Sequence, residues 1–155
     1  MKFPRRPPRI SVFQHYASPV YFVTFCTYDR RPWLATTQVH GGFVHFAENA
    51  EHRFNIAVGQ YVIMPDHVHL FVCGPKDFVL GRWIGLLKQT LAKAAGKPAA
   101  GGTPWQEGFF DHLLRSDESM SEKWGYIRRN PVRAALVQRP EDWPYQGQVV
   151  PIDRA

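Results

Sequence analysis

Two histidines one residue apart are the side chains in this sequence best suited to chemistry. His67 and His69 lie in an apolar stretch, directly after the turn signal Pro65-Asp66. In a β-strand, side chains alternate between faces, so both imidazoles would point to one face, about 7 Å apart along the backbone. Imidazole nitrogens are frequent metal ligands, and the spacing therefore indicates a shared metal ion. The alternative is a pair of histidines that only form hydrogen bonds at a sheet surface.

A tyrosine and an amide follow further along the chain at helical spacing. Tyr126 and Asn130 are four residues apart, so a helix from Ser119 to about Asn130 would present them on one side. Pro131 would stop that helix, because the residue before a proline is pushed out of helical geometry. Each residue alone also has an ordinary interpretation, Tyr126 as a half-buried helix tyrosine and Asn130 as a helix cap.

The elements that must position these groups follow from the apolar pattern. β-Branched and aromatic runs predict strands at 20–28, 56–64, 67–74 and 109–115. Amphipathic spacing predicts helices at 37–53 and 80–93, before the helix that carries the tyrosine. The order βαββαβ is that of a ferredoxin-like α+β fold, with one antiparallel sheet and helices on one face. The additional C-terminal helix would cover the other face and bring Tyr126 to the histidines.

Length and composition predict a single domain over residues 1–155. Within it we expect a basic, proline-rich arm at 1–15 and an irregular tail at 138–155. No apolar run approaches the roughly 20 residues of a membrane helix, and no segment of signal-peptide type is found. We therefore expect a cytoplasmic, nucleoid-associated protein of bacterial type without membrane contact.

The charge balance favours an anionic partner. Lys and Arg number 19 against 13 Asp and Glu, a net charge of +6, which favours nucleic acid, although a basic surface tuned for solubility is an equal alternative. Candidate phosphate contacts are Arg30, Arg31, Lys88, Arg115, Arg128, Arg129 and Arg133. Phe109 and Phe110 could stack on bases, but their apolar surroundings favour core packing.

Four blocks of the sequence resemble one family of DNA-processing enzymes. Met64–Leu70 looks like the His-hydrophobic-His (HUH) motif of single-tyrosine transposases. Residues 126–137 resemble the tyrosine-helix signature of one branch, the REP-associated tyrosine transposases, a type of IS200-like transposase. Residues 21–25 and 105–112 look like two further blocks of that branch, in the same order. Any one block is a weak signal, whereas the four together are highly specific.

The resemblance implies a role for each matching residue. Tyr126 would attack a single-stranded DNA phosphodiester, leaving a 5′-phosphotyrosine and a free 3′-hydroxyl. His67, His69 and Asn130 would hold a divalent metal ion, Mg²⁺ or Mn²⁺. The expected partner is a DNA hairpin formed by a REP-like palindrome. Relatives also imply a monomer, with a homodimer that exchanges the tyrosine helix as the alternative.

Two positions depart from the family pattern. Position 66 is Asp where relatives more often carry Asn, and position 135 is Ala where Gly is common. Asp66 could change metal or phosphate binding, although a role in the turn is favoured, and Ala135 could change how the helix ends. Neither removes a reactive group, so we interpret the chain as an HUH endonuclease and strand transferase. The alternative is a domesticated hairpin-binding protein that rarely cuts.

Overall fold

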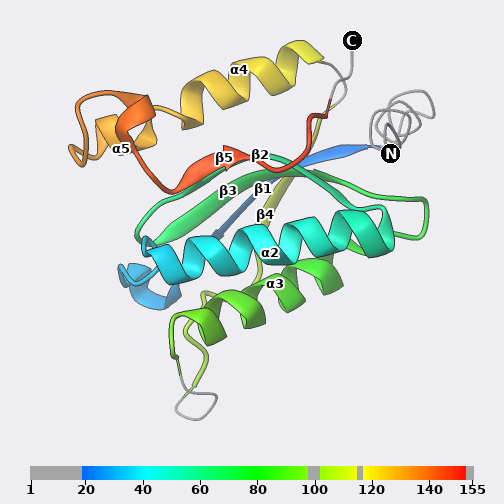
Figure 1. The fold of residues 1–155 in the computed structure, drawn as a ribbon, viewed down its shortest axis with the longest axis horizontal. Helices are drawn as coiled ribbons and strands as arrows, with labels where there is room; N and C mark the ends of the chain where they lie inside the picture. Colours follow the sequence, from blue (N-terminus) through cyan, green and yellow to red (C-terminus); the bar gives the residue numbers. More distant parts are fainter. Residues whose placement is uncertain (1–18, 98–101, 115–116, 153–155) are drawn as a thin grey trace.

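Five strands form one antiparallel sheet at the centre of the protein (Figure 1). The structure is a computed structural model that describes residues 19–97, 102–114 and 117–152. The strand order is β4-β1-β3-β2-β5. The strands are β1 (Val20–Cys26), β2 (Ala57–Ile63), β3 (His67–Cys73), β4 (Phe110–Leu114) and β5 (Gln146–Gln148). The first four have the ferredoxin-like arrangement that the sequence predicts, and this fold class is confirmed.

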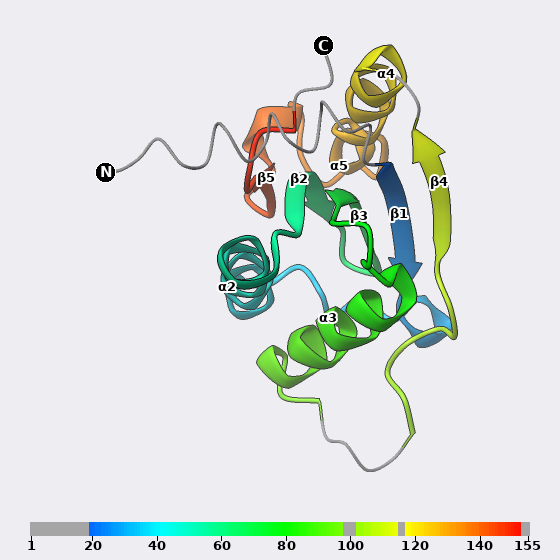
Figure 2. The same ribbon diagram turned by 90° about the vertical axis from the view of Figure 1, so that its right-hand side faces the viewer.

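Two long helices cover one face of the sheet (Figure 2). They are α2 (Thr37–Phe54) and α3 (Leu80–Ala94). The Thr36 side chain caps α2 by accepting a hydrogen bond from the Val39 backbone N–H, and Asn55 ends it in the left-handed conformation. Their fully buried residues, such as Phe43 and Leu87, pack against every second side chain of the central strands.

A third helix, α4 (Asp117–Ile127), covers the opposite face, as predicted (Figure 1). Ile127 of α4 joins Phe71 of β3 and Leu114 of β4 in a second buried cluster, with Met120 and Trp124 packed against it. This face carries the alternate residues of β3, so it is also the face of His67 and His69.

The predicted single helix to Asn130 is wrong. α4 ends at Ile127, and a separate short helix, α5 (Asn130–Arg133), begins three residues later with Pro131 in its first turn. Proline is well tolerated there because its missing N–H would have no helical partner. Pro131 therefore begins a helix instead of ending one, and Tyr126 and Asn130 lie on two different helices.

The C-terminal segment is more ordered than the predicted irregular tail. It contains a 3-10 helix (Pro140–Asp142) and β5, which pairs antiparallel with β2 at the sheet edge. Trp143 donates its Nε1–H to the Ile63 carbonyl oxygen at 3.0 Å, and Val150 and Ile152 are buried. The predicted basic arm at 1–15 lies outside the described residues. Within those residues, no helix is long and apolar enough to cross a membrane.

Candidate active site

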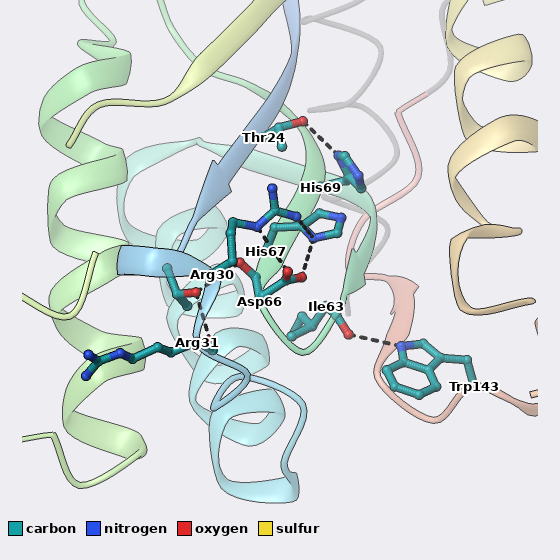
Figure 3. A network of polar contacts seen from close by, with 9 residues as sticks. Thr24, Arg30, Arg31, Ile63, Asp66, His67, His69 and Trp143 are labelled. Atoms are coloured by element: carbon teal, nitrogen blue, oxygen red, sulfur yellow. Dashed lines mark hydrogen bonds and ion pairs between the residues drawn. The ribbon is translucent and has the colours of Figure 1, made fainter. Parts of the chain in front are cut away.

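The two histidines lie side by side at the start of β3, as the sequence predicts. Their ring centroids are 4.8 Å apart and the rings are nearly perpendicular, at 81°. His69 Nδ1 lies 2.7 Å from the Thr24 hydroxyl of β1, and His67 Nδ1 lies 2.7 Å from Asp66 Oδ1 (Figure 3). Both rings are thus held through Nδ1, which leaves each Nε2 as the nitrogen with which it can bind a ligand.

Asp66 connects His67 to an arginine from the end of β1. Its Oδ2 accepts a hydrogen bond from Arg30 Nε at 3.0 Å, while its Oδ1 accepts from His67 Nδ1–H (Figure 3). Arg30 Nη2 also lies 3.3 Å from His67 Nδ1. Because the proton on His67 Nδ1 points to Asp66, both of these nitrogens are donors, and we take only the His67–Asp66 contact as a hydrogen bond. Asp66 therefore does more than form the turn, because it orients a histidine.

The backbone around Arg30 is built to place that side chain. Asp29 and Arg30 have φ values of 55° and 52°, a left-handed conformation that costs free energy for residues other than glycine. The Thr27 N–H donates to the Asp66 carbonyl oxygen and the Leu34 N–H to that of Pro65, both at 3.0 Å. These bonds fasten the loop after β1 to the turn before β3, and so hold Arg30 beside His67.

Both histidines favour the neutral form. Burial, followed by the nearby His67, Arg133 and Arg30, lowers the pKa of His69 to about 3. Burial, helped by the charge of Arg30, also lowers the pKa of His67, although the hydrogen bond and charge of Asp66 act in the opposite direction. Burial alone would raise the pKa of Asp66, but the hydrogen bonds from His67 and Arg30 together with their positive charges make the net shift downward. A carboxylate and two neutral imidazoles, each with a lone pair, therefore face one side of the sheet.

The helix that carries the tyrosine approaches this side. Phe22 of β1 stacks on His69, with ring centroids 5.5 Å apart, and Lys123 Nζ of α4 lies 5.4 Å from the Phe22 ring centroid. Tyr126, three residues further along α4, is 66% exposed. The exposed position leaves its phenol accessible to a large substrate.

Arg133 brings the tyrosine and the amide together across the helix break. Its guanidinium carbon lies 3.9 Å from the Tyr126 ring centroid. Its Nη2 donates to the Tyr126 carbonyl oxygen at 2.7 Å and to Asn130 Oδ1. The positive charge of Arg133 is one of the causes, after burial and His67, that lower the pKa of His69. Arg133 thus links Tyr126 and Asn130 across the helix break, and a site that these two residues share with the histidines stays a prediction.

The predicted phosphate contacts are not all in one place. Arg30 lies beside His67 and Arg133 contacts Tyr126 and Asn130, whereas the Arg31 side chain points away from the histidines (Figure 3). The Lys88 ammonium group donates to the carbonyl oxygens of Gln106 and Gly108 and so has a structural role on the opposite face of the sheet. Arg128 lies 4.0 Å from Glu141 and Arg129 is exposed. Arg115 lies outside the described residues, and DNA contact by any of these residues stays a prediction.

Sequence reasoning missed the residues that support the site. Thr24 is a cross-strand partner of His69, and only the β1–β3 register reveals that they meet. Phe110 was expected in the core, yet it is 67% exposed. It is the cross-strand partner of Thr24, so it shares the face of His69. Phe109, by contrast, is partly buried against the main core, as expected.

The imidazole nitrogens of the two histidines could supply some, but not all, of the ligands that a divalent cation needs. Two neutral imidazoles with available Nε2 atoms suit a transition-metal or mixed nitrogen–oxygen site. Asn130 would add an amide oxygen, which has a second lone pair beyond the one that accepts from Arg133. No group of three or more His, Cys, Asp and Glu side chains in the described part of the chain could hold a metal ion. The amide is therefore needed if the protein is to supply three ligands.

Comparison with known proteins identifies the class to which this fold and site belong. The family described as "Transposase IS200 like" matches residues 15–130, and the chain belongs to that family. A curated protein of Haemophilus influenzae, provisionally named a REP-associated tyrosine transposase, is 27% identical over 137 residues, which cover 81% of this chain and 77% of that protein. The resemblance to the REP-associated branch is thereby confirmed.

Two solved structures share the fold. A REP-associated tyrosine transposase bound to a REP hairpin has a TM-score of 0.70 and 24% identity, covering 84% of this chain and 76% of that one. A provisionally named transposase of Deinococcus radiodurans has a TM-score of 0.50 and 19% identity, covering 83% and 97%. At these sequence identities, the structural similarity shows only a shared fold. Membership of the transposase family shows that the chain is a DNA-processing enzyme.

Proposed function

We propose that this protein is a metal-dependent single-strand DNA endonuclease and strand transferase that acts at hairpins through a covalent bond to Tyr126. The observation that carries the proposal is that α4, the helix of Tyr126, covers the face of the sheet on which His67 and His69 lie (Figure 1), while Arg133 contacts both Tyr126 and Asn130. Membership of a transposase family supports the same reading.

The reaction we propose exchanges one phosphodiester for another. The Tyr126 Oη bonds to the scissile phosphorus as the bond to the 3′ oxygen breaks; the phenol loses its proton and the departing oxygen gains one. The product is a 5′-phosphotyrosine, which conserves the phosphodiester bond for rejoining to another strand. A phenol with an ordinary pKa near 10 is a weak nucleophile at neutral pH, so it needs electrostatic help at the phosphate.

His67, His69 and Asn130 would hold a divalent cation, Mg²⁺ or Mn²⁺, at the phosphate. When bound, the cation would supply positive charge to the non-bridging oxygens as negative charge develops there. The chain's own contribution is orientation: Thr24 and Asp66 fix the two rings through Nδ1, so that both Nε2 atoms serve the ion. Burial keeps both rings unprotonated at neutral pH.

The surface around the site suits single-stranded DNA. Arg30 and Arg133 are exposed cations, and the half-buried Lys123 of α4 adds a further positive charge near Phe22. Exposed Phe110 offers an aromatic face on which a base could stack. One solved relative is bound to a REP hairpin, and we propose a hairpin of that kind as the substrate here.

The test is cleavage of a labelled hairpin oligonucleotide with single-stranded flanks, in the presence of Mn²⁺. Wild type should give a nicked strand and a protein–DNA adduct. Tyr126→Phe should lose both but keep hairpin affinity, because only the attacking oxygen is removed. His67→Ala with His69→Ala, or excess chelator, should also abolish cleavage. Hairpin binding by wild type without any cleavage would instead support the domesticated binding protein.

A further inference from the structure

Arg133 lies just beyond the segment that matches the transposase family, which ends at residue 130. It is the last residue of α5, and its side chain is exposed. Long exposed side chains normally keep much conformational freedom. This one has two hydrogen bonds and a ring contact, which together fix its guanidinium group.

The contacts of Arg133 join both sides of the break between α4 and α5. The Tyr126 carbonyl oxygen is near the end of α4, where it accepts from the Arg129 backbone N–H at 3.3 Å as well as from Arg133. Asn130 Oδ1 is at the start of α5. The planar guanidinium group reaches both oxygens while it lies against the Tyr126 ring, a combination that the ammonium group of lysine cannot reproduce.

An amide oxygen can accept two hydrogen bonds or ligands. Because Arg133 occupies one position on Asn130 Oδ1, it fixes how the amide is turned and leaves the other position available. The same guanidinium group limits the orientations of the Tyr126 ring. One side chain thus sets the relative placement of the nucleophile and the amide ligand.

We propose that Arg133 is a positioning residue that holds Tyr126 and Asn130 in the geometry for strand cleavage, and not merely a cation that attracts DNA. This inference rests on the proposed function. It separates Arg133 from the other arginines at the surface, such as Arg129, for which charge alone is the expected contribution. A positioning residue affects the rate of the bound complex, whereas a phosphate contact mainly affects DNA affinity.

The kinetic test compares wild type with Arg133→Ala, Arg133→Lys and a control, Arg53→Ala. Arg53 is an exposed arginine at the end of α2, on the opposite face of the sheet. At saturating hairpin, both Arg133 variants should cleave about 10–100-fold more slowly, with little change in the DNA concentration for half-maximal rate. Arg53→Ala should behave like wild type.

Two kinetic results would overturn the inference. If Arg133→Ala only weakens DNA binding and cleaves at the wild-type rate when saturated, Arg133 is a phosphate contact. If Arg133→Lys is fully active, positive charge is all that the position requires. Should Arg133→Ala fail to fold, the lysine variant carries the test, because it keeps the aliphatic part of the side chain.

A second measurement needs neither metal nor DNA. In NMR spectra of the metal-free protein, the Tyr126 ring signals and the Asn130 side-chain amide signals should shift in Arg133→Lys and not in Arg53→Ala. Unchanged signals would contradict the contacts on which the inference depends. If wild type itself fails to cleave, the proposed function is wrong, whereas the NMR comparison still decides whether Arg133 orders these two side chains.

Discussion

At the scale of single residues, the site depends on groups that orient the histidines. His67 is turned by Asp66 and His69 by Thr24, both through Nδ1. Such partners commonly matter almost as much as the ligands themselves, because they fix which nitrogen carries the proton. The carboxylate at position 66, a departure from the family pattern, also binds Arg30. It therefore links His67, a proposed metal ligand, to the guanidinium group of Arg30.

Substitution of Asp66 should separate ring orientation from charge. Asp66→Ala removes the acceptor for His67 Nδ1–H, so we expect cleavage to fall about 10–100-fold. Asp66→Asn keeps an acceptor oxygen and should retain most of the activity. Initial rates of cleavage of the hairpin oligonucleotide measure the activity of both variants, and circular dichroism shows whether each variant is folded. An alanine variant as active as wild type would show that the ring needs no such partner.

The low pKa of His69 predicts a loss of stability in acid. Because its folded-state pKa, about 3, lies below the ordinary 6.5, the unfolded chain takes up a proton between these values and the folded protein does not. Stability should therefore fall as pH drops from 6.5 towards 3, by up to about 1.4 kcal/mol per pH unit for this histidine. Urea unfolding from pH 7 to pH 5 should show a smaller loss in His69→Gln. Equal losses of stability in wild type and His69→Gln would contradict this prediction.

At the scale of elements, the break between α4 and α5 is the feature that matters most. The hydrophobic pattern and family blocks correctly predicted the helix that crosses the sheet. They could not show that it stops at Ile127, because Pro131 is compatible with both the end and the beginning of a helix. Only the structure shows that Arg133 replaces a shared helical face as the link between Tyr126 and Asn130.

The end of α5 gives a stability prediction. Ala135 has a φ of 60°, a conformation that costs an alanine about 1–2 kcal/mol and a glycine almost nothing. After allowance for the greater freedom of glycine in the unfolded chain, Ala135→Gly should stabilise the protein by about 0.5–1 kcal/mol.

Ala134, with a φ of −84°, is the matched control. Glycine at that position relieves no backbone strain in the folded state, so Ala134→Gly should destabilise the protein slightly. Thermal or urea unfolding of the two variants should therefore give shifts of opposite sign. A destabilised Ala135→Gly variant would contradict the strain assigned to this position.

At the scale of the whole molecule, the sheet order follows from the element order, and the sequence alone predicts most of it. The edge strand β5 was not predicted, because Gln146–Gln148 has none of the β-branched and aromatic residues that mark a strand. Exposed Phe110 was misassigned for a related reason: residue type does not reveal which strand lies at an edge. The candidate site residues were predicted from their spacing and from family resemblance, whereas the contacts of Thr24 and Arg133 emerged only from the tertiary structure.

The packing of α4 bears on whether Tyr126 acts with the histidines of its own chain. Ile127 is buried against the sheet of its own chain, so we propose that Tyr126 acts with the histidines of the same molecule. A mixture of Tyr126→Phe protein with the His67→Ala, His69→Ala double variant should then stay inactive. Each variant lacks one half of the site, so exchange of the tyrosine helix in a dimer would restore cleavage. Restored activity on mixing would contradict the single-chain arrangement.

The most direct test of the central claim is to identify the amino acid that becomes bonded to DNA. Wild-type protein is incubated with Mn²⁺ and a hairpin oligonucleotide, denatured, digested with nuclease and protease, and examined by mass spectrometry. We predict a peptide that contains Tyr126 with a 5′-linked nucleotide on the phenol oxygen, and no such peptide when chelator is present. Cleaved DNA without any adduct, or an adduct on another residue, would contradict the account.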